Sequence, residues 1–401
     1  MLTSPPTSPP DPLSVNGEEA PSPALLPVYA PMPLRAASGH GSWLVDENGE
    51  EWLDAYGGHA VSSTGHSHPK VVKAIADQAS TLLFYSTAVP HHAREDLAER
   101  LARLCPDPLK KVFLCNSGAE ANENALHLAR RFTGRQTIVT LTGGWHGRTA
   151  ATLACCDGAR YEDGARRAGM PLSRKARFND LDSLSAALDH TVAALLLEPV
   201  QGMAGARDCS REFLEGARRL CDERGIVLIF DEIQCGAGRS GRFTAAESFG
   251  VTPDIISLAK GLASGLPIGA VIATPRLTSS LQTGDLGSTF GGGPVPCAAA
   301  IATLDVIDEE KLLENVVQVE TRLRAGAKQL GLAVQGKGLL LGLRLARPAV
   351  QVQRSLFGRR ILTGTASDPE VLRLLPALTF SSREVDLLLE GLAASLAEEI
   401  Q

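Results

Sequence analysis

The 401-residue chain contains no uninterrupted run of about 20 apolar residues, so no segment is expected to cross a membrane as a helix. It also lacks a dense block of lysine and arginine, and its formal net charge is −6. Nucleic acids and anionic membranes are therefore poor candidates for its partners, although a local basic pocket for an anionic ligand fits this composition. Small molecules are the favoured partners.

None of the eight cysteines belongs to a Cys-x-x-Cys pair, and no histidine cluster has zinc-site spacing. The cysteines lie in apolar stretches, which predicts reduced core thiols in a cytoplasmic protein. The histidines His66 and His68, and likewise His91 and His92, have no neighbouring cysteine or paired carboxylates. We therefore predict structural roles for these four side chains and no bound metal.

The first 24 residues are rich in proline and serine, contain three acidic residues and lack an apolar segment. Neither a secretory signal nor a transit peptide fits such a composition. We expect a disordered leader over residues 1–24.

What the chain does have is enough apolar sequence, 44%, for a large buried core. Asn48-Gly49 between two short strand-like runs predicts a hairpin in an N-terminal lobe, residues 25–95. Residues 96–295 are expected to form a large domain, and residues 296–401 a linking helix and a small C-terminal α/β domain. In that last part we predict a helical stretch over Cys297–Leu330, strand character over Leu332–Leu345 and a final helix over Ser382–Glu399.

In the large domain, short apolar runs alternate with helical stretches. Continuous apolar runs of this length suit strands that are buried on both faces. They lie at residues 111–115, 137–141, 193–197, 226–230 and 255–258. Strands alternating with helices predict an α/β fold with a mostly parallel central sheet covered by helices.

Polar residues follow three of these strands, at the edge where open α/β sheets bind ligands. After the run 111–115, Ser117 and Glu120 have the spacing of a capping box, and Gly118 would let an anion approach the first N–H groups of the next helix. A plain helix cap without a ligand is the alternative.

Asp231 ends a fully apolar run, where a carboxylate needs a cation or a hydrogen-bond donor as partner. A protonated ring nitrogen would serve. The alternatives are a cap on the following turn or an ion pair with Arg239 or Arg242.

Lys260 follows the run 255–258, where burial would lower the pKa of its amine, as a Schiff-base nucleophile requires. Most lysines at strand ends simply reach solvent, which is the alternative. Three strand ends of one sheet thus offer an anion site, an acid and an amine. Pyridoxal phosphate has a matching group for each: its phosphate, its ring nitrogen and the carbon that forms a Schiff base. This combination favours that cofactor.

From about Tyr29 to Ala397 the sequence resembles the class III aminotransferases, and within them the acetylornithine aminotransferase group. Seven motifs occur in the order typical of that family. They are Asn116-Ser-Gly-Ala-Glu-Ala-Asn-Glu, Trp145-His-Gly-Arg-Thr, Leu197-Glu-Pro-Val-Gln-Gly, Phe230-Asp-Glu-Ile-Gln-Cys-Gly-Ala-Gly-Arg-Ser-Gly, Leu258-Ala-Lys-Gly-Leu, Gly287-Ser-Thr-Phe-Gly-Gly and Leu372-Arg-Leu-Leu-Pro. The resemblance implies the aspartate-aminotransferase-like fold (fold type I) and a homodimer with its active sites at the subunit interface.

The resemblance also implies how the cofactor is held. Asp231 would pair with the pyridinium nitrogen, and Trp145 would stack on the ring, where many relatives have phenylalanine. Gln234 would reach the ring hydroxyl while Ile233 packs against the ring. The phosphate would be bound by Ser117, Gly118 and Ala119, and closed in by Ser288 and Thr289 of the partner subunit.

For catalysis, the resemblance gives Lys260 two roles, as cofactor anchor and as proton carrier at the substrate carbon. Arg148 would take the carboxylate of acetylornithine, and Arg373 a carboxylate of glutamate; a guanidinium suits both. The loop of Glu198 would line the substrate site. Two positions depart from the family pattern: Met203 stands where glutamate-using relatives commonly have a glutamate that pairs with the arginine at position 373, and Gly293 stands where asparagine is usual.

The resulting hypothesis is transfer of the terminal amino group of an N2-acylated ornithine, acetyl or succinyl, to 2-oxoglutarate in arginine biosynthesis. Within the same chemistry the alternatives are another ω-amino donor, such as acetyllysine, ornithine or 4-aminobutyrate, or an aminomutase. A non-catalytic binding protein on the same fold is the alternative from another class, and the presence of Lys260, Asp231 and Gln234 together argues against it.

Overall fold

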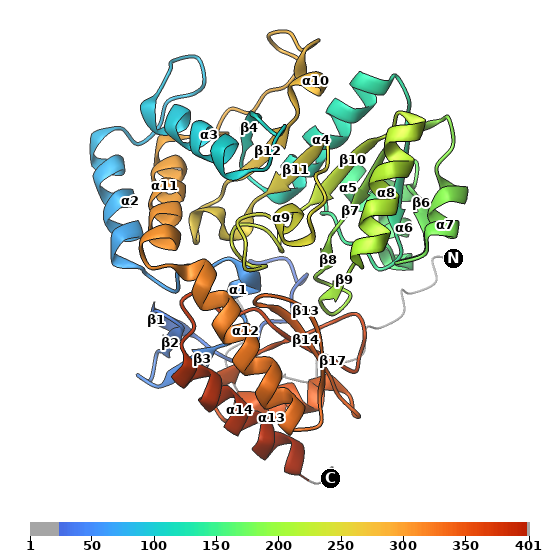
Figure 1. The fold of residues 1–401 in the computed structure, drawn as a ribbon. Coiled ribbons are helices and arrows are strands. Elements are labelled where there is room, and N and C mark those ends of the chain that lie inside the picture. Colours follow the sequence, from blue (N-terminus) through green and yellow to red (C-terminus); the bar gives the residue numbers. More distant parts are fainter. Residues whose placement is uncertain (1–23, 399–401) are drawn as a thin grey trace.

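A seven-stranded sheet forms the centre of the large domain in a computed structural model that describes residues 24–398 (Figure 1). Its strand order is β4 (Lys111–Cys115), β12 (Gly269–Ala273), β11 (Ile255–Leu258), β10 (Val227–Asp231), β7 (Val192–Leu197), β5 (Thr137–Leu141) and β6 (Arg174–Ala176). All strands run in one direction except β12, which is antiparallel to both neighbours. The predicted α/β fold with a mostly parallel sheet is therefore confirmed.

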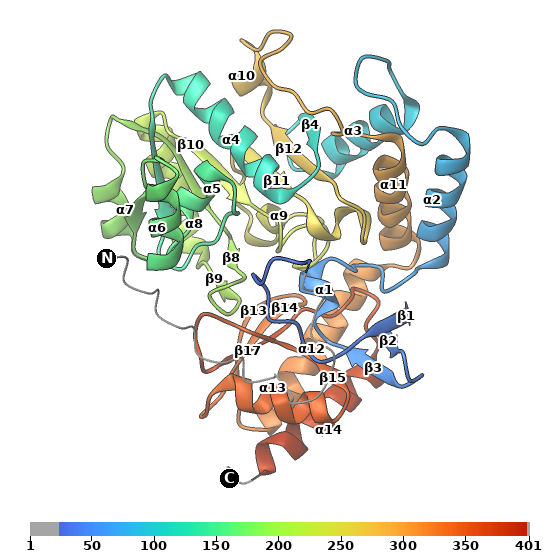
Figure 2. The same cartoon turned by 180° about the vertical axis from the view of Figure 1, so that it is seen from behind.

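Helices cover both faces of this sheet, which explains its continuous apolar strands. On β10, Val227 and Ile229 pack with residues of α4 (Gly118–Thr133) and α5 (Ala150–Cys155). The alternate residues Leu228 and Phe230 pack on the other face, with α8 (Arg211–Arg224). Figures 1 and 2, seen from opposite sides, show α8 in front of the sheet in one view and α4 and α5 in the other.

All five predicted strands are present within one residue of their expected bounds. Two strands of the sheet were not predicted. β6 has only three residues, two of them charged, at the sheet edge, so it carries no apolar run. β12 follows the turn after Lys260 and returns antiparallel between β11 and β4.

The C-terminal lobe corrects one expectation and confirms the strand character predicted over Leu332–Leu345. The helical stretch predicted over Cys297–Leu330 is two helices, α11 (Pro294–Glu309) and α12 (Leu312–Gln329), because Lys311 between them adopts a left-handed φ of +52°. The segment Leu332–Leu345 is a hairpin of β13 (Ala333–Lys337) and β14 (Leu340–Arg344) that turns at Gly338. With β17 (Val371–Leu374) and β16 (Gly364–Thr365) it forms a second sheet, which contacts α12 and α13 (Ala349–Gly358), and α14 (Ser382–Ala397) packs on these two helices.

The predicted N-terminal hairpin is present as β2 (Trp43–Asp46) and β3 (Glu51–Asp54), beside β1 (Ala36–His40). The Asp46 carboxylate accepts the N–H groups of Asn48 and Glu50 and so fixes the turn. β3 also pairs in parallel with β15 (Ile361–Leu362), so this small sheet lies against the C-terminal lobe (Figure 2). The predicted leader, residues 1–24, lies outside the described residues except for its last one.

The cysteines lie in the core as predicted, and three of the four histidines have the structural contacts that were predicted, whereas the His92 side chain is exposed. All eight cysteines are buried and unpaired, and burial raises the pKa of their thiols. His68 and His91 cap α2 (Pro69–Thr81) and α3 (His92–Leu104), and His66 bonds Asp54 at 2.8 Å. Over residues 24–398, no three His, Cys, Asp or Glu side chains are grouped to hold a metal, and no helix is long and apolar enough to span a bilayer.

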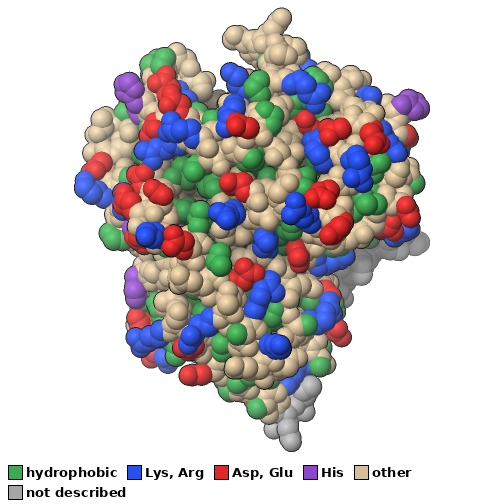
Figure 3. Space-filling view, viewed as in Figure 1, with side chains coloured by type: hydrophobic (Ala, Val, Ile, Leu, Met, Phe, Trp, Pro, Cys, Tyr) green, Lys and Arg blue, Asp and Glu red, His purple; other side chains and the backbone are tan. Residues whose placement is uncertain are grey.

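Charges of both signs are interspersed on the face in Figure 3.

Candidate active site

Five segments that follow parallel strands meet at the carboxyl edge of the central sheet, as the topology requires. β4 leads to Ser117, β5 to the loop with Trp145, and β7 to Glu198; β10 ends at Asp231 and β11 leads to Lys260. Tertiary contacts described below join these segments. The sequence therefore predicted correctly that its polar strand ends lie along one edge.

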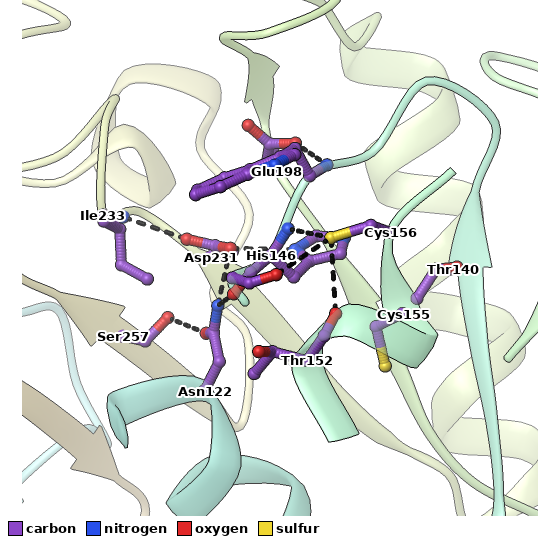
Figure 4. A network of polar contacts seen from close by, with 12 residues as sticks. Asn122, Thr140, His146, Thr152, Cys155, Cys156, Glu198, Asp231, Ile233 and Ser257 are labelled. Carbon is purple, nitrogen blue, oxygen red and sulfur yellow. Dashed lines mark hydrogen bonds and ion pairs between the residues drawn. The ribbon is translucent and has the colours of Figure 1, made fainter. Parts of the chain in front are cut away.

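Asp231 is 3% exposed and lies in a fixed network of donors (Figure 4). Its Oδ2 atom accepts from Asn122 Nδ2 and from His146 Nδ1, each at 2.8 Å, and Oδ1 accepts from the N–H of Ile233 at 3.1 Å. Ser257 on β11 donates to Asn122 Oδ1 at 2.6 Å and orients that amide.

These donors replace the arginine partners that we considered for Asp231. Arg239 donates instead to the carbonyls of Leu339 and Pro376. Neither Arg239 nor Arg242 makes an ion pair with Asp231. A carboxylate can accept about four hydrogen bonds, so three donors leave one acceptor position on Asp231 for a ligand.

Lys260 starts a short 3-10 helix, Lys260–Ala263, with a left-handed φ of +45°. Its Nζ atom lies 5.8 Å from the centre of the Trp145 ring and makes no hydrogen bond or ion pair with residues 24–398. Burial lowers the pKa of this amine; Arg373 adds to the lowering, while the charges of Asp231 and Glu198 oppose it. A half-buried amine of lowered pKa without a protein partner suits a nucleophile, so the solvent-lysine alternative is not supported.

The helix cap predicted after β4 is present at the start of α4, and anion binding there stays a prediction. Ser117 caps the helix by accepting from the N–H of Glu120 at 3.2 Å. The reciprocal bond of a capping box is missing, because the Glu120 carboxylate accepts from the Asn116 N–H and the Ser117 hydroxyl instead. A Cβ on Gly118 would lie 2.8 Å from side-chain atoms of Ile233, so any larger residue there would require that side chain to shift.

Glu198 fixes the loop that carries Trp145. Its Oε1 atom accepts from the Trp145 N–H at 2.8 Å and its Oε2 atom from the Gly202 N–H at 3.0 Å. The carbonyl of Gly202 in turn accepts from Arg373 Nη1 at 3.2 Å. One carboxylate thus links the aromatic ring beside Lys260 to the backbone that holds Arg373.

Arg373 on β17 is 2% exposed, and all its partners are neutral. Besides Gly202, its Nε atom donates to the Thr365 carbonyl at 2.6 Å and its Nη2 atom to the Tyr56 hydroxyl at 2.9 Å. At the position of the missing carboxylate, the Met203 carbonyl accepts from Ser367. No carboxylate among the described residues pairs with Arg373, which leaves its charge for a ligand.

The remaining predicted residues are Gln234, Ser288, Arg148, Thr289 and Ala119. Gln234 donates to the His59 carbonyl at 3.4 Å and packs against Gly202, and Ser288 accepts from Asn116 of its own chain at 3.0 Å. Arg148 and Thr289 are exposed and make no hydrogen bond or ion pair within residues 24–398. Ala119 contacts the backbone of the Trp145 loop, because a Cβ built on Gly147 would lie 3.0 Å from it.

Sequence reasoning missed the residues that hold the predicted ones in place. Asn122 and His146 lie inside motifs that we had identified, but nothing in the spacing indicated that both bind Asp231. Tyr56 and His59 come from the N-terminal segment, 317 and 314 positions before Arg373, and carried no motif signal. Polar residues on the buried side of a helix, such as Asn122, or inside an apolar strand, such as Ser257, were the available signal.

The arrangement fits pyridoxal phosphate. The cofactor needs an amine, an acid at the far end of a flat ring, an aromatic face and a phosphate cradle. Lys260, Asp231, Trp145 and the start of α4 offer these groups, and the Lys260 amine and the buried Trp145 Nε1 atom lack protein partners in the described part of the chain. The fold and site are those of a pyridoxal-phosphate enzyme with the aspartate-aminotransferase-like fold.

Comparisons with known proteins agree. The family model Aminotransferase class-III matches residues 27–396. The chain is 38% identical to acetylornithine aminotransferase of Nitrosomonas europaea over 92% of its own length and 96% of the relative, and 40% identical to acetylornithine aminotransferase 1 of Bordetella bronchiseptica over 91% and 95%. Its structure is similar to ornithine aminotransferase of Toxoplasma gondii, with a TM-score of 0.87, 29% identity and coverage of 93% and 92%. The chain belongs to the class III aminotransferases and is a pyridoxal-phosphate-dependent aminotransferase.

Glu198 gives the site a testable dependence on pH. Burial raises the pKa of its carboxyl from 4.5 to about 7, although the two backbone donors oppose this. The folded protein then binds the proton more tightly than the unfolded chain does, so the free energy of unfolding falls as the pH rises from about 4.5 to about 7. The full shift corresponds to at most about 3 kcal/mol.

We expect Glu198→Gln to flatten this dependence, because the amide has no proton to lose. Urea unfolding of both proteins between pH 5 and pH 7.5 measures the slopes. Glu95→Gln, an exposed carboxylate on α3, is the control and should keep the wild-type slope. Equal slopes for Glu198→Gln and wild type would show that Glu198 is ionised throughout this range.

Proposed function

We propose that this enzyme transfers the terminal amino group of an N2-acylated ornithine, acetyl or succinyl, to 2-oxoglutarate, as a step of arginine biosynthesis in the cytoplasm. The observation that carries the substrate class is a pair of arginines without carboxylate partners within residues 24–398, Arg148 at the exposed rim and Arg373 in the buried wall. The names of the similar proteins from Nitrosomonas europaea and Bordetella bronchiseptica support the same substrate.

We propose the following roles for the site residues. Pyridoxal phosphate, when bound, supplies an electron-poor ring that draws electrons from the substrate carbon bearing the amine. Asp231 would hold the protonated ring nitrogen, Trp145 and Ile233 would enclose the ring, and Gln234 would bind its hydroxyl. The phosphate is bound by Ser117, Gly118 and Ala119.

The protein's part in the reaction is to hold carboxylates and to move one proton. Arg148 binds the carboxylate of the acylated ornithine, and Arg373 a carboxylate of glutamate or 2-oxoglutarate. The Lys260 amine would anchor pyridoxal phosphate and, when free, would act as the base that takes the proton from the substrate carbon and later gives it up again. Trp145 and the Glu198 loop exclude water from this amine.

A donor panel tests the substrate. Purified enzyme with pyridoxal phosphate and 2-oxoglutarate is assayed for glutamate formation with acetylornithine, succinylornithine, ornithine, acetyllysine and 4-aminobutyrate. We expect kcat/KM to be highest for an acylated ornithine. Equal or higher values for ornithine, which the Toxoplasma gondii neighbour's name makes the most pertinent competitor, would contradict the proposal.

We also propose that the enzyme is a homodimer whose partner subunit supplies Ser288 and Thr289. Exposed apolar side chains gather beside these residues: Leu82, Leu83, Tyr85 and Phe290, with Phe290 63% exposed and its ring 4.8 Å from that of Phe84. Such a patch fits a protein interface. Light scattering should give twice the chain mass, and Phe290→Asp should lower it; a monomeric wild type would contradict this proposal.

A further inference from the structure

We infer that His59 is a positioning residue for carboxylate binding: through the Tyr56 hydroxyl, its protonation state sets how strongly Arg373 binds a dicarboxylate. This inference rests on the proposed function, in which Arg373 receives a carboxylate of the oxo acid. It concerns side chains to which neither the motifs nor the family comparisons assign a role.

The contacts form a chain from the exposed rim to the buried guanidinium. His59 is exposed, and its Nδ1 atom lies 2.9 Å from the Tyr56 hydroxyl. That hydroxyl lies 2.9 Å from Arg373 Nη2. The two rings of His59 and Tyr56 meet edge to face with centroids 4.8 Å apart.

The direction of these hydrogen bonds follows from the chemistry of the groups. A guanidinium only donates, so the Tyr56 oxygen is the acceptor from Arg373. The Tyr56 proton is then free to be donated, and the nearest acceptor is Nδ1 of a neutral His59. When His59 is protonated, Nδ1 carries a hydrogen, becomes a donor and competes with Arg373 for the same oxygen.

Protonation of His59 therefore has two effects that act in the same direction. It weakens the hold of Tyr56 on Arg373 Nη2, which frees that donor for a ligand. It also adds a second positive charge near a guanidinium whose present partners are all neutral. Both effects favour an incoming carboxylate.

The surroundings favour the neutral form of His59 when no such ligand is bound. Burial and the charges of Arg373 and Lys260 lower the pKa of His59. The other groups around this segment are the Tyr56 phenol, the Gln234 amide on the His59 carbonyl, and the Asp54 carboxylate, which accepts the N–H groups of Tyr56 and Gly57. A bound carboxylate offsets the two positive charges, so ligand binding and proton uptake are coupled.

The backbone at this point is consistent with a functional constraint. His59 and Ala60 adopt left-handed φ values of +67° and +66°, which non-glycine residues seldom do. Strained residues of this kind cluster at ligand sites, where the surrounding structure holds them. The strain places the His59 ring beside Tyr56.

The test uses glutarate, a dicarboxylate that has no oxo group and cannot be turned over. Its binding to the cofactor-loaded enzyme is measured by calorimetry between pH 6 and pH 8.5, in two buffers of different ionisation enthalpy, which gives affinity and proton uptake. For wild type we expect affinity about fivefold higher at pH 6 than at pH 8.5, with net proton uptake. His59→Asn keeps an acceptor for Tyr56 but cannot be protonated, so both the pH effect and the extra proton uptake should disappear.

Three comparisons make the result specific. His92→Asn changes an exposed histidine on α3 and should behave as wild type. Tyr56→Phe removes the connecting hydroxyl but keeps His59, and should also reduce the pH effect. His59→Asn should leave KM for the acylated ornithine, which Arg148 is proposed to bind, unchanged, whereas KM for the oxo acid should lose its dependence on pH.

The inference is overturned if His59→Asn and Tyr56→Phe both retain the wild-type proton uptake with glutarate. It is also overturned if His59→Asn alters KM for donor and acceptor equally, because that indicates a purely structural role. Failure of the proposed function is a separate result: wild type would bind glutarate with the expected proton uptake but show no transamination of any acylated ornithine.

Discussion

Replacing Lys260 by alanine is expected to lower kcat for transamination by at least about 10⁴-fold. Two functions are lost together. The side chain is the only amine near the Trp145 ring among the described residues, with Nζ 5.8 Å from the ring centre, and it is proposed both to anchor the cofactor and to carry the substrate proton. Steady-state rates with an acylated ornithine and 2-oxoglutarate measure the loss.

Lys260→Arg separates the two properties of this side chain. Arginine keeps the positive charge but cannot act as a nucleophile or a proton acceptor at neutral pH. We therefore expect it to be as inactive as the alanine variant and to lack the yellow colour of lysine-bound cofactor. An active arginine variant would mean that the charge of Lys260, and not its free amine, is what matters.

Lys73→Ala is the control for a lysine in an ordinary setting. Its amine is exposed on α2 and pairs with Asp77 at 2.6 Å, far from the sheet edge in sequence and in contacts. We expect wild-type activity and colour. Both Lys260 variants should unfold at nearly the wild-type temperature, because Nζ has no protein hydrogen bond to lose within residues 24–398.

The sequence was most informative where hydrophobicity alone indicates that a segment is a buried strand. Runs such as 226–230 are apolar throughout, which favours strands buried on both faces, and the connectivity then places Asp231 and Lys260 at one edge. Neither residue alone indicated a function. The presence of three such groups on one sheet edge narrowed the possible cofactors to pyridoxal phosphate. The family motifs then assigned a role to each group.

What the sequence could not indicate depends on distances between segments far apart in the chain. The bond from Asn122 to Asp231 spans 109 positions, and that from Tyr56 to Arg373 spans 317. Periodicity contains no information on such pairs. The break at Lys311 was missed for a different reason, since a single left-handed residue leaves the apolar pattern of α11 and α12 almost continuous.

Replacing Asp231 by asparagine is the second large expected effect, a loss of about 10²- to 10³-fold in kcat. The carboxylate is proposed to hold a protonated ring nitrogen, and an amide removes the negative charge while keeping the size of the side chain. Single-turnover rates of the half-reaction with an acylated ornithine measure this step without product release. The cofactor should still bind through Lys260.

In Asp231→Asn, the hydrogen bonds at this position allow the effect of losing the negative charge to be separated from the effect of a shifted side chain. Asn122 and His146 both donate to Oδ2, so an asparagine can keep them by presenting its amide oxygen there. Its NH₂ group then faces the N–H of Ile233, which is also a donor. That one unfavourable contact should cost about 1 kcal/mol of stability, which thermal unfolding can detect.

Asn122→Ala is the matched variant for position. It keeps the charge and the bond from His146 but removes one of the two donors to Oδ2 and leaves Ser257 without its acceptor. We expect a rate loss of about tenfold, much smaller than for Asp231→Asn. If Asn122→Ala were as slow as Asp231→Asn at equal stability, orientation and not charge would be the main contribution of Asp231. If the expected order holds, the charge of Asp231 contributes more than its orientation, and the buried donors serve to orient that carboxylate.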